Sequence, residues 1–324
     1  MHVLITGAAG FVGSHLVDRY LNDGATVTGI DNLLTGNIAN LAAAHSRAEF
    51  SFVNADVAGD WSPVDALLES SYSRPELVLH FASPASPADY ALFSLETLAA
   101  NAWGTQNCCA LAARLGARLV YASTSEVYGE PLNHPQAETY WGNVNPVGPR
   151  SCYDESKRFG EAMVCAYARC KDLDVRIVRI FNTYGPRMRR DDGRVIPNFI
   201  SQALAGKALT LYGSGQQTRS FCYVDDLVEG IVRLARADVP SATIVNLGNP
   251  VERTVLELAR SVAKLIGVAL NVEHRALPVD DPSRRCPDIT RARRLLQWEP
   301  QVELEEGLQR TIASFMADGR IAQR

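Results

Sequence analysis

The chain has 324 residues, of which 47% are hydrophobic and 21% charged, values typical of a globular protein with one large domain or two smaller ones. Its 32 basic and 36 acidic residues give a formal net charge of −4, which disfavours nucleic acid and acidic membrane surfaces unless a local basic patch exists. The Arg189-Arg190 pair is followed at once by Asp191-Asp192, so we expect no nucleic-acid partner.

The seven cysteines are odd in number and form no C-x-x-C pair, which predicts reduced thiols in a reducing compartment. The six histidines lack the spacing of metal ligands, so no metal site is expected. No stretch reaches the length of a membrane span, and residues 1–5 match a strand rather than a leader sequence. We therefore expect a cytoplasmic protein without a membrane partner.

Strand and helix patterns alternate from the first residues onward. Strands are predicted near 2–6, 25–30, 50–54, 77–81, 117–122 and 174–180, and helices near 11–22, from about 63, at 88–115 and from about 152. This alternation is typical of an α/β protein with a doubly wound parallel sheet. The apolar runs at 77–81 and 175–180 suit strands that are covered on both faces.

The pattern changes after Gly185-Pro186. A loop at 187–194 rich in Arg, Asp and Gly precedes shorter elements: helices near 197–204, 224–236, 254–266, 289–297 and 304–317, and strands near 209–212, 220–223 and 243–247. We expect a dinucleotide-binding domain over 1–184 and a smaller mixed α/β substrate lobe over 185–324. Part of 209–248 is expected to return to the main sheet.

A glycine-rich turn follows the first predicted strand. Gly7, Gly10 and Gly13 lie where backbone must approach a pyrophosphate at a helix N-terminus, and Asp31 ends the second strand. An acid at that position accepts hydrogen bonds from a ribose diol and repels a 2′-phosphate, which favours NAD over NADP. Asp56 is either an adenine contact or a turn cap. The predicted cofactor-binding set is Gly7, Gly10, Phe11, Val12, Gly13, Asp31, Asn32, Asp56, Val57, Asn101, Tyr153 and Lys157.

Tyr153 and Lys157 lie four residues apart, on one face of the predicted helix. A nearby ammonium favours the phenolate, and so does the positive ring of a bound NAD⁺, so Tyr153 is a candidate base. Thr124 offers a second hydrogen bond to the same substrate oxygen. Glu126 adds a carboxylate that simple alcohol oxidation does not require; alternatively, it caps a turn or pairs with an arginine.

A longer series of motifs resembles the extended short-chain dehydrogenase/reductase family, the NAD-dependent nucleotide-sugar epimerases and dehydratases, and within it the enzymes that decarboxylate UDP-glucuronate. The resemblance covers almost the whole chain. Its most specific stretches are 82–87 (ASPASP), 123–129 (STSEVYG), 140–142 (YWG), 148–157 (GPRSCYDESK), 181–188 (FNTYGPRM), 193–195 (GRV), 212–215 (YGSG), 217–219 (QTR) and 280–288 (DDPSRRCPD). Residues 37–39, where relatives usually carry basic residues, and a longer segment around Trp61 depart from the pattern.

The resemblance implies a Rossmann fold, NAD as the cofactor, a UDP-sugar as the substrate and a decarboxylation that yields UDP-xylose. It implies catalytic roles for Thr124, Glu126, Tyr153, Lys157 and Arg285. The expected substrate-binding set is Ser83, Ser86, Tyr90, Asn182, Arg187, Asn198, Tyr212, Arg219 and Arg285.

Some of these residues also fit a purely structural role. Ser83, Ser86 and Asn182 are common turn formers, and Arg285 would look the same in a solvated basic turn. Arg219 either binds a diphosphate or pairs with the acidic residues at 225–226.

Other activities remain open. A 4,6-dehydratase or 4-epimerase of the same family, release of the 4-keto pentose, and a non-catalytic NAD-binding regulator are the alternatives. The dehydratases usually carry Asp-Glu after the threonine, where this chain has Ser125-Glu126, and a regulator often lacks the Tyr/Lys pair.

An apolar stripe on the helix from about 152 to 171 comprises Phe159, Met163, Ala166, Tyr167 and Cys170. Most such stripes face their own core. The resemblance implies a homodimer through this helix and the one near 88–115.

Overall fold

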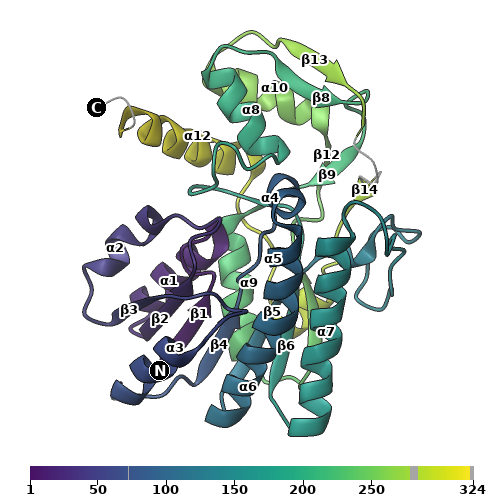
Figure 1. Ribbon diagram of the computed structural model, residues 1–324. Coiled ribbons are helices and arrows are strands. Elements are labelled where there is room, and N and C mark those ends of the chain that lie inside the picture. The colour runs from purple at the N-terminus through teal and green to yellow at the C-terminus, as the bar shows by residue number, and fades with distance from the viewer. Residues whose placement is uncertain (72, 278–283, 322–324) are drawn as a thin grey trace.

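A computed structural model describes residues 1–71, 73–277 and 284–321; of 318–321 it describes the backbone only. A seven-stranded sheet with helices on both faces forms the lower part of the molecule in Figure 1, and a smaller lobe lies above it. The sheet strands are β1 (His2–Thr6), β2 (Thr26–Asp31), β3 (Phe50–Asn54), β4 (Leu77–His80), β5 (Arg118–Thr124), β6 (Val175–Ile180) and β11 (Thr243–Leu247).

The sheet has the order β11-β6-β5-β4-β1-β2-β3, and every neighbouring pair is parallel. The chain builds outward from β1 in one direction and from β4 in the other. The crevice between these two strands, at their carboxyl ends, is therefore where an open parallel sheet binds a ligand. This arrangement confirms the predicted doubly wound fold. Strand β11 shows that part of 209–248 joins the main sheet.

Two hydrophobic cores cover the two faces of the sheet. One face packs against α1 (Phe11–Asn22), α2 (Ala42–His45), α9 (Val224–Arg236) and α11 (Thr290–Leu296). The other packs against α3 (Ser62–Ser70), α6 (Thr105–Leu115) and α7 (Ser151–Lys171). Central strands buried on both sides explain the unbroken apolar runs of β4 and β6.

The upper lobe contains short elements that follow or interrupt the main sheet. Its helices are α8 (Val195–Leu204), α10 (Val255–Ile266) and α12 (Leu304–Ile321), and its strands are β8 (Leu209–Tyr212), β9 (Thr218–Ser220), β12 (Glu252–Thr254), β13 (Val272–Arg275) and β14 (Arg284–Arg285). β12, β9 and β14 form one small sheet, and β13 pairs with β8. A further short parallel pair joins β7 (Thr183–Tyr184) to β10 (Cys222–Tyr223).

The single helix predicted at 88–115 is wrong. The chain instead forms α4 (Pro87–Leu92), α5 (Ser94–Ala99), a π-helical turn η2 (Ala100–Gly104) and α6. Phe93 leaves the helical region with φ −113° and ψ 51°, which separates α4 from α5. At the π turn, the hydroxyl group of Thr105 donates a hydrogen bond to the carbonyl oxygen of Asn101 (2.7 Å). A side chain thus supplies a hydrogen bond to a backbone acceptor of this wider turn.

The strand predicted at 220–223 is split into β9 and β10, and the patterns missed the shortest elements: η1 (Ile38–Leu41), α2, η3 (Ser125–Tyr128), β7, β12, β13 and β14. Each of these is too short to show a period of its own. Among the described residues, no helix is both long and apolar enough to cross a membrane.

Candidate active site

A cavity of about 520 Å³ lies at the carboxyl ends of the sheet strands, between the sheet and the upper lobe. The glycine turn, the ends of β2, β4, β5 and β6, the start of α7 and residues of the upper lobe line it. All of the predicted catalytic and substrate-binding residues line this cavity, and so does every predicted cofactor residue except Asn101. The fold therefore gathers residues that are up to 278 positions apart, from Gly7 to Arg285.

The glycine turn is shaped to admit backbone and ligand but no side chain. Gly7 has φ +71°, and a Cβ there would lie 2.8 Å from the backbone of Phe81 and Ala82. A Cβ on Gly13 would collide with the backbone of Gly7. Because Gly10 caps α1 without a side-chain hydrogen bond, the first turn of this helix presents its backbone amides to the cavity. The turn therefore fits the pyrophosphate of a dinucleotide.

Asp31, the predicted ribose contact, lines the cavity at the end of β2. Its Oδ2 accepts a hydrogen bond from the amide of Ala9 (2.9 Å) and its Oδ1 accepts one from the amide of Leu33 (2.8 Å). Burial raises the pKa of Asp31 from its ordinary value, and the amide hydrogen bonds oppose this rise. The orientation of the carboxylate is therefore fixed before a ribose binds, and each oxygen keeps a lone pair for a hydroxyl group.

Asp56 caps a turn, which was one of the two roles predicted for it, and it also lines the cavity. Its Oδ1 accepts from the amide of Ala58 (2.8 Å), which caps the turn, and its Oδ2 accepts from the side-chain amide of Asn32 (3.0 Å). Val57 is almost fully buried beside them. These residues shape the wall expected to face the adenine.

The prediction of a direct cofactor contact for Asn101 needs correction. The π turn η2 points this side chain into the interior, where it is fully buried and does not line the cavity. Its Nδ2 donates to Ser83 Oγ and Ser156 Oγ, both at 3.0 Å. Asn101 therefore holds the loop at 82–87 against α7 from behind, and its Oδ1 has no partner among the described residues.

Tyr153 and Lys157 lie on one face of α7, as the spacing predicts. The ring of Tyr153 stacks on that of Tyr90, with centroids 5.0 Å apart and planes 8° apart. The Nζ of Lys157 lies 5.8 Å from the centroid of the Tyr153 ring and donates to the carbonyl oxygen of Ala122 (2.8 Å). The phenol, the ammonium group and Thr124 thus meet at the end of β5.

Burial opposes the formation of a phenolate at Tyr153. Burial raises the pKa of Tyr153 to about 12, although a hydrogen bond with Thr124 opposes this rise. Burial also lowers the pKa of Lys157 to about 7. The expectation that Lys157 favours the phenolate is therefore outweighed here by desolvation. A cation placed against the phenol, such as the nicotinamide ring of NAD⁺, would shift the balance toward the phenolate.

Glu126 does pair with arginine, and with two of them. Its Oε2 accepts from Arg150 Nη2 at 2.5 Å, while its Oε1 accepts from Arg285 Nη1. Arg285 belongs to β14 in the upper lobe, and Arg150 immediately precedes α7. Arg285 is therefore buried inside the cavity wall rather than in a solvated turn, and burial lowers its pKa to about 10.

The serines of the loop at 82–87 have defined structural partners. Ser86 caps α4, since its Oγ accepts from the amide of Asp89 (3.1 Å), and Ser83 donates to the carbonyl oxygen of Pro84 (3.0 Å). The hydroxyl group of Tyr90 is buried, with no hydrogen-bond partner among the residues described. It lies next to Tyr153 and lines the cavity, so a bound ligand is its natural partner.

The residues on the lobe side of the cavity are mostly held by protein contacts. Arg187 pairs with Asp18 of α1 (2.5 Å), and the side-chain amide of Asn198 donates to the carbonyl oxygen of Gly193 (2.9 Å). Arg219 donates to the carbonyl oxygen of Thr218 (2.9 Å). The residues 225–226 offered as its alternative partners have others: Asp225 pairs with Arg310, and Asp226 accepts from the amide of Val302. Asn182 and Tyr212 complete the lining.

Comparison with known proteins assigns the chain to a family. The family model described as "NAD dependent epimerase/dehydratase family" matches residues 3–248, three quarters of the chain. The chain belongs to this NAD-dependent epimerase/dehydratase family. Members of this family depend on NAD, and the glycine turn, Asp31 and the buried Tyr153/Lys157 pair fit that cofactor.

Two curated relatives illustrate the similarity in sequence. The chain is 50% identical over 313 residues to UDP-glucuronic acid decarboxylase 1 of Xenopus tropicalis, covering 97% of this chain and 72% of the relative. It is also 50% identical over 315 residues to UDP-glucuronic acid decarboxylase 2 of Arabidopsis thaliana, covering 97% and 68%.

Solved structures of the epimerase/dehydratase family share the whole fold at lower identity. A UDP-glucose 4-epimerase of Thermotoga maritima with UDP-glucose has a TM-score of 0.88 at 28% identity, covering 98% of this chain and 99% of that one. A UDP-glucuronic acid 4-epimerase of Bacillus cereus in complex with UDP-glucuronic acid and NAD has a TM-score of 0.87 at 27% identity, with the same coverage.

Sequence reasoning missed two arginines of this epimerase/dehydratase site. Arg150 precedes Tyr153 by three residues, so the same helical spacing that paired Tyr153 with Lys157 points to it. Arg194 lines the cavity, is paired with Asp192 (2.5 Å) and lowers the pKa of Tyr153 in opposition to burial. Arg194 lies within 193–195 (GRV), one of the stretches that carry the resemblance, and this was the signal that could have found it.

Three residues of metal-ligand type meet outside the cavity, although no spacing in the sequence suggests it. Ligand atoms of His134, Glu252 and Cys286 lie within 4.8 Å of one another. Each has a protein partner: His134 Nε2 lies 2.9 Å from Glu252 Oε2, and Cys286 Sγ donates to the carbonyl oxygen of Pro250 (3.3 Å). These contacts account for the cluster as a tie between the loop after η3 and the upper lobe.

Proposed function

We propose that this protein decarboxylates UDP-glucuronate to UDP-xylose, with transient oxidation at carbon 4 of the sugar. The observation that carries the proposal is the position of the Glu126–Arg285 pair in the same buried wall as Tyr153 and Lys157. Curated decarboxylases that are about 50% identical over nearly the whole chain support the same activity.

Oxidation at carbon 4 requires a base and a hydride acceptor. Bound NAD⁺ supplies the reversible acceptor that makes carbon 4 a ketone and later an alcohol again. Tyr153, as phenolate, takes the proton of the carbon-4 hydroxyl group, and Thr124 donates a hydrogen bond to the same oxygen. Lys157 is held by the carbonyl oxygen of Ala122, so its ammonium group remains near Tyr153 throughout.

The resulting ketone lies β to the sugar carboxylate, so it accepts the electron pair that remains when CO₂ leaves. Tyr153, now protonated, and Thr124 stabilise the enolate oxygen. A proton then reaches carbon 5 from a water molecule or an acid near Glu126 and Arg285. The uncharged loop at 82–87 lines the same cavity and helps to exclude water from the site of CO₂ loss.

An assay with UDP-glucuronate tests the proposal. The protein with NAD⁺ is incubated with this substrate while CO₂, absorbance of NADH and the sugar product are followed. We expect stoichiometric CO₂ and UDP-xylose without accumulation of NADH. Accumulated NADH with a 4-keto pentose would show that the second reduction is slow.

The same assay discriminates the rival reactions of the family. UDP-galacturonate without CO₂ would identify a 4-epimerase, the activity named for the structural neighbour from Bacillus cereus. A 4-keto-6-deoxy sugar formed from a nucleotide hexose, with no CO₂ from any nucleotide hexuronate, would identify a 4,6-dehydratase. Binding of NAD without turnover of any nucleotide sugar would support the remaining alternative, a non-catalytic NAD-binding regulator.

A Tyr153→Phe variant tests the proposed base. Removing a general base typically lowers the rate by about 10²- to 10⁴-fold, so we expect a loss of turnover in this range. Binding of NAD and UDP should be retained, because the ring and its stacking on Tyr90 remain. Unchanged turnover would exclude Tyr153 from the mechanism.

We further propose a homodimer and a cytoplasmic location. Large apolar side chains are exposed along α4, α5 and η2 and on α7: Leu92, Leu95, Leu98, Trp103 and Phe159. In Figure 1, α5 and α7 lie side by side, so a second copy could cover both. Light scattering after size exclusion would test the dimer, and a monomer at micromolar concentration would contradict it. The cytoplasmic location is supported by seven free cysteines.

The division of the chain also remains a proposal: 1–184 as the NAD-binding domain and 185–324 mainly as the nucleotide-sugar lobe. It is supported by the side of the cavity on which each residue lies, with the exception of α9, β11 and α11, which belong to the main sheet or pack on it.

A further inference from the structure

We propose that Arg150 is a positioning residue that supplies the second positive charge needed for Arg285 to bind a sugar carboxylate while Glu126 stays ionised. The inference rests on the proposed function, because it concerns a substrate that carries a carboxylate. It assigns a task to a residue that the predicted catalytic and substrate-binding sets do not include.

The geometry divides the Glu126 carboxylate between two cations. Arg150 takes Oε2 and Arg285 takes Oε1, and all three side chains are at least 85% buried. Burial makes each charge more dependent on its neighbours than a surface pair would be. Because the two arginines bind different oxygens of the carboxylate, they fix its orientation.

Arg285 keeps one edge of its guanidinium group for a ligand. Only Nη1 contacts Glu126, whereas Nε and Nη2 are buried and have no hydrogen-bond partner within the described ranges. Nε and Nη2 form the parallel pair of donors that matches the two oxygens of a carboxylate. A sugar carboxylate can therefore bind Arg285 while Glu126 remains on Nη1.

The balance of charge explains why a second arginine is needed. Glu126 already neutralises Arg285, and Asp154 Oδ2 lies 4.0 Å from Arg150 Nε. Arg150 therefore places a positive charge beside both Glu126 and Asp154. Without Arg150, Arg285 would have to hold both Glu126 and the substrate carboxylate.

Arg150 also has contacts that a purely structural residue would have. Its guanidinium carbon lies 5.8 Å from the centroid of the Tyr90 ring, which stacks on Tyr153. Loss of Arg150 for packing reasons alone would disturb every ligand of the cavity equally. A role in charge balance predicts instead a loss confined to ligands that carry a carboxylate. This difference defines the experiment.

The test measures binding by calorimetry in the Tyr153→Phe background with NAD⁺, which prevents turnover. UDP-glucuronate and UDP-xylose are compared, because they differ by the carboxylate. We expect Arg150→Met to weaken the binding of UDP-glucuronate by at least about tenfold, which corresponds to about 1.4 kcal/mol of binding free energy. The affinity for UDP-xylose should remain unchanged. Arg150→Lys should recover part of the loss, because it restores the charge but not the planar fork.

A double variant makes the prediction specific to charge. Adding Glu126→Gln to Arg150→Met removes one negative and one positive charge, so affinity for UDP-glucuronate should return to within about threefold of the background. Arg169→Met, at an exposed position of α7, serves as the matched control and should change the affinity for neither ligand.

The outcomes separate this inference from the proposed function. Equal weakening of both ligands by Arg150→Met, or no recovery in the double variant, would overturn the role in charge balance. If instead the Tyr153→Phe background itself binds UDP-glucuronate no more tightly than UDP-xylose, and the unmodified protein releases no CO₂, the proposed function fails.

Discussion

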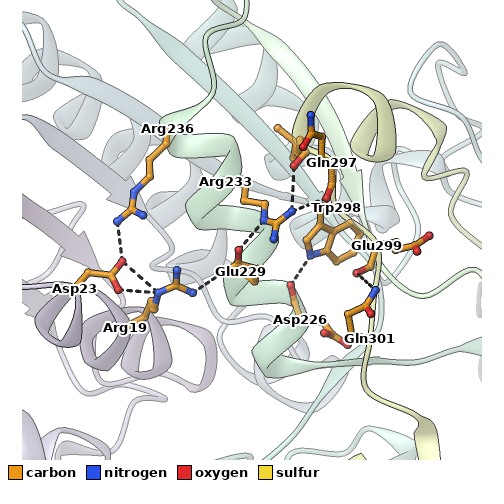
Figure 2. Close-up of polar contacts among 11 residues, drawn as sticks. Arg19, Asp23, Asp226, Glu229, Arg233, Arg236, Gln297, Trp298, Glu299 and Gln301 are labelled. Atoms are coloured by element: carbon orange, nitrogen blue, oxygen red, sulfur yellow. Dashed lines mark hydrogen bonds and ion pairs between the residues drawn. The ribbon is translucent and has the colours of Figure 1, made fainter.

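The molecule uses arginine–carboxylate pairs in two regions with different surroundings. On the outer face of α1 and α9 they form a ladder that Figure 2 shows: Arg19 lies between Asp23 and Glu229, Arg233 contacts Glu229, and Arg236 contacts Asp23. Their side chains are 26–51% exposed. Arg233 also donates to the carbonyl oxygen of Gln297 (2.5 Å), which ties the C-terminal segment to α9.

The second region lies in and behind the cavity wall. Glu126 is shared by Arg150 and Arg285, and Glu161 of α7 accepts two hydrogen bonds from Arg179 of β6, at 2.7 and 2.8 Å. None of these side chains is more than 15% exposed. The side-chain types are the same as in the ladder, but water is largely excluded.

The comparison shows that burial, and not the pairing itself, decides what an ion pair does. In the ladder, water already solvates each charge, so each pair contributes little to stability. In the interior, loss of one partner leaves a charge with neither water nor a counter-ion. Such groups are costly to build, and a function of the kind proposed for Glu126 and Arg285 accounts for their presence.

The largest expected effect compares Arg179→Met with Arg236→Met. Among the described residues, Arg179→Met leaves the buried Glu161 with the hydroxyl group of Ser123 as its remaining hydrogen-bond donor, and should lower the free energy of unfolding by about 3–5 kcal/mol. Arg236→Met should lower it by less than about 1 kcal/mol. Urea unfolding at pH 7 measures both.

A second substitution keeps this result interpretable. Adding Glu161→Gln to Arg179→Met removes the uncompensated charge and should recover part of the lost stability. If the Arg179 and Arg236 variants are equally stable, the proposed contrast between the two regions does not hold.

A smaller effect is expected in how the free energy of unfolding depends on pH, because buried and exposed groups contribute in different pH ranges. Burial, with a contribution from Lys157, lowers the pKa of His80 to about 3 from its ordinary value of 6.5. Between these values the unfolded chain holds a proton that the folded chain lacks, so stability falls as the pH drops, by up to about 1.4 kcal/mol per pH unit. In the ladder, burial raises the pKa of Glu229 but hydrogen bonds from Arg233 and Arg19 outweigh this and lower it. Its contribution is therefore lost only as the pH falls below the ordinary 4.5.

Between pH 6.5 and 5 the buried histidine is thus expected to contribute while Glu229 does not. His80→Gln should flatten the dependence of stability on pH in this window, as measured by urea unfolding at three pH values. The exposed His45→Gln variant controls for the loss of an imidazole at the surface. An identical pH dependence in the His80 variant and the unmodified protein would contradict the prediction. His2 and His15 also have pKa values lowered by burial, so some dependence should remain.

The smallest effect concerns the ladder itself. Glu229→Gln removes the acid between Arg19 and Arg233 and should lower the free energy of unfolding by less than about 1 kcal/mol. The difference from the unmodified protein should shrink further in 1 M NaCl, where the Debye length is about 3 Å. Thermal unfolding at two salt concentrations measures it, and a difference that grows with salt would show that the ladder is not simply a surface feature.

Much of the fold was predictable because its strands and long helices carry strong local signals. The apolar runs of β4 and β6 and the glycine turn before α1 were placed within a residue or two. The helix over 88–115 was wrong because the π turn η2 and the break at Phe93 follow from packing against the sheet and α7, and leave no mark on helical periodicity.

The candidate site was predictable as a set of residues but not as an arrangement. The spacing of Tyr153 and Lys157 was enough to place both on one face of α7. The pairing of Glu126 with Arg285, which is 159 positions away, depends on how the upper lobe meets the sheet. The same holds for the meeting of His134, Glu252 and Cys286.

The sequence by itself determined the parallel sheet, the dinucleotide turn and the pair on α7, because these depend on periods and spacings within about thirty residues. Only the tertiary structure decided the direction in which the pKa values of the site shift. Burial raises the pKa of Tyr153 and lowers that of Lys157, although their spacing alone suggests the opposite for the tyrosine. The tertiary structure likewise decided that Asn101 supports the cavity from behind and that two arginines share one glutamate. Desolvation and long-range pairing are properties of the packed chain, since both depend on which distant segments exclude water from a group.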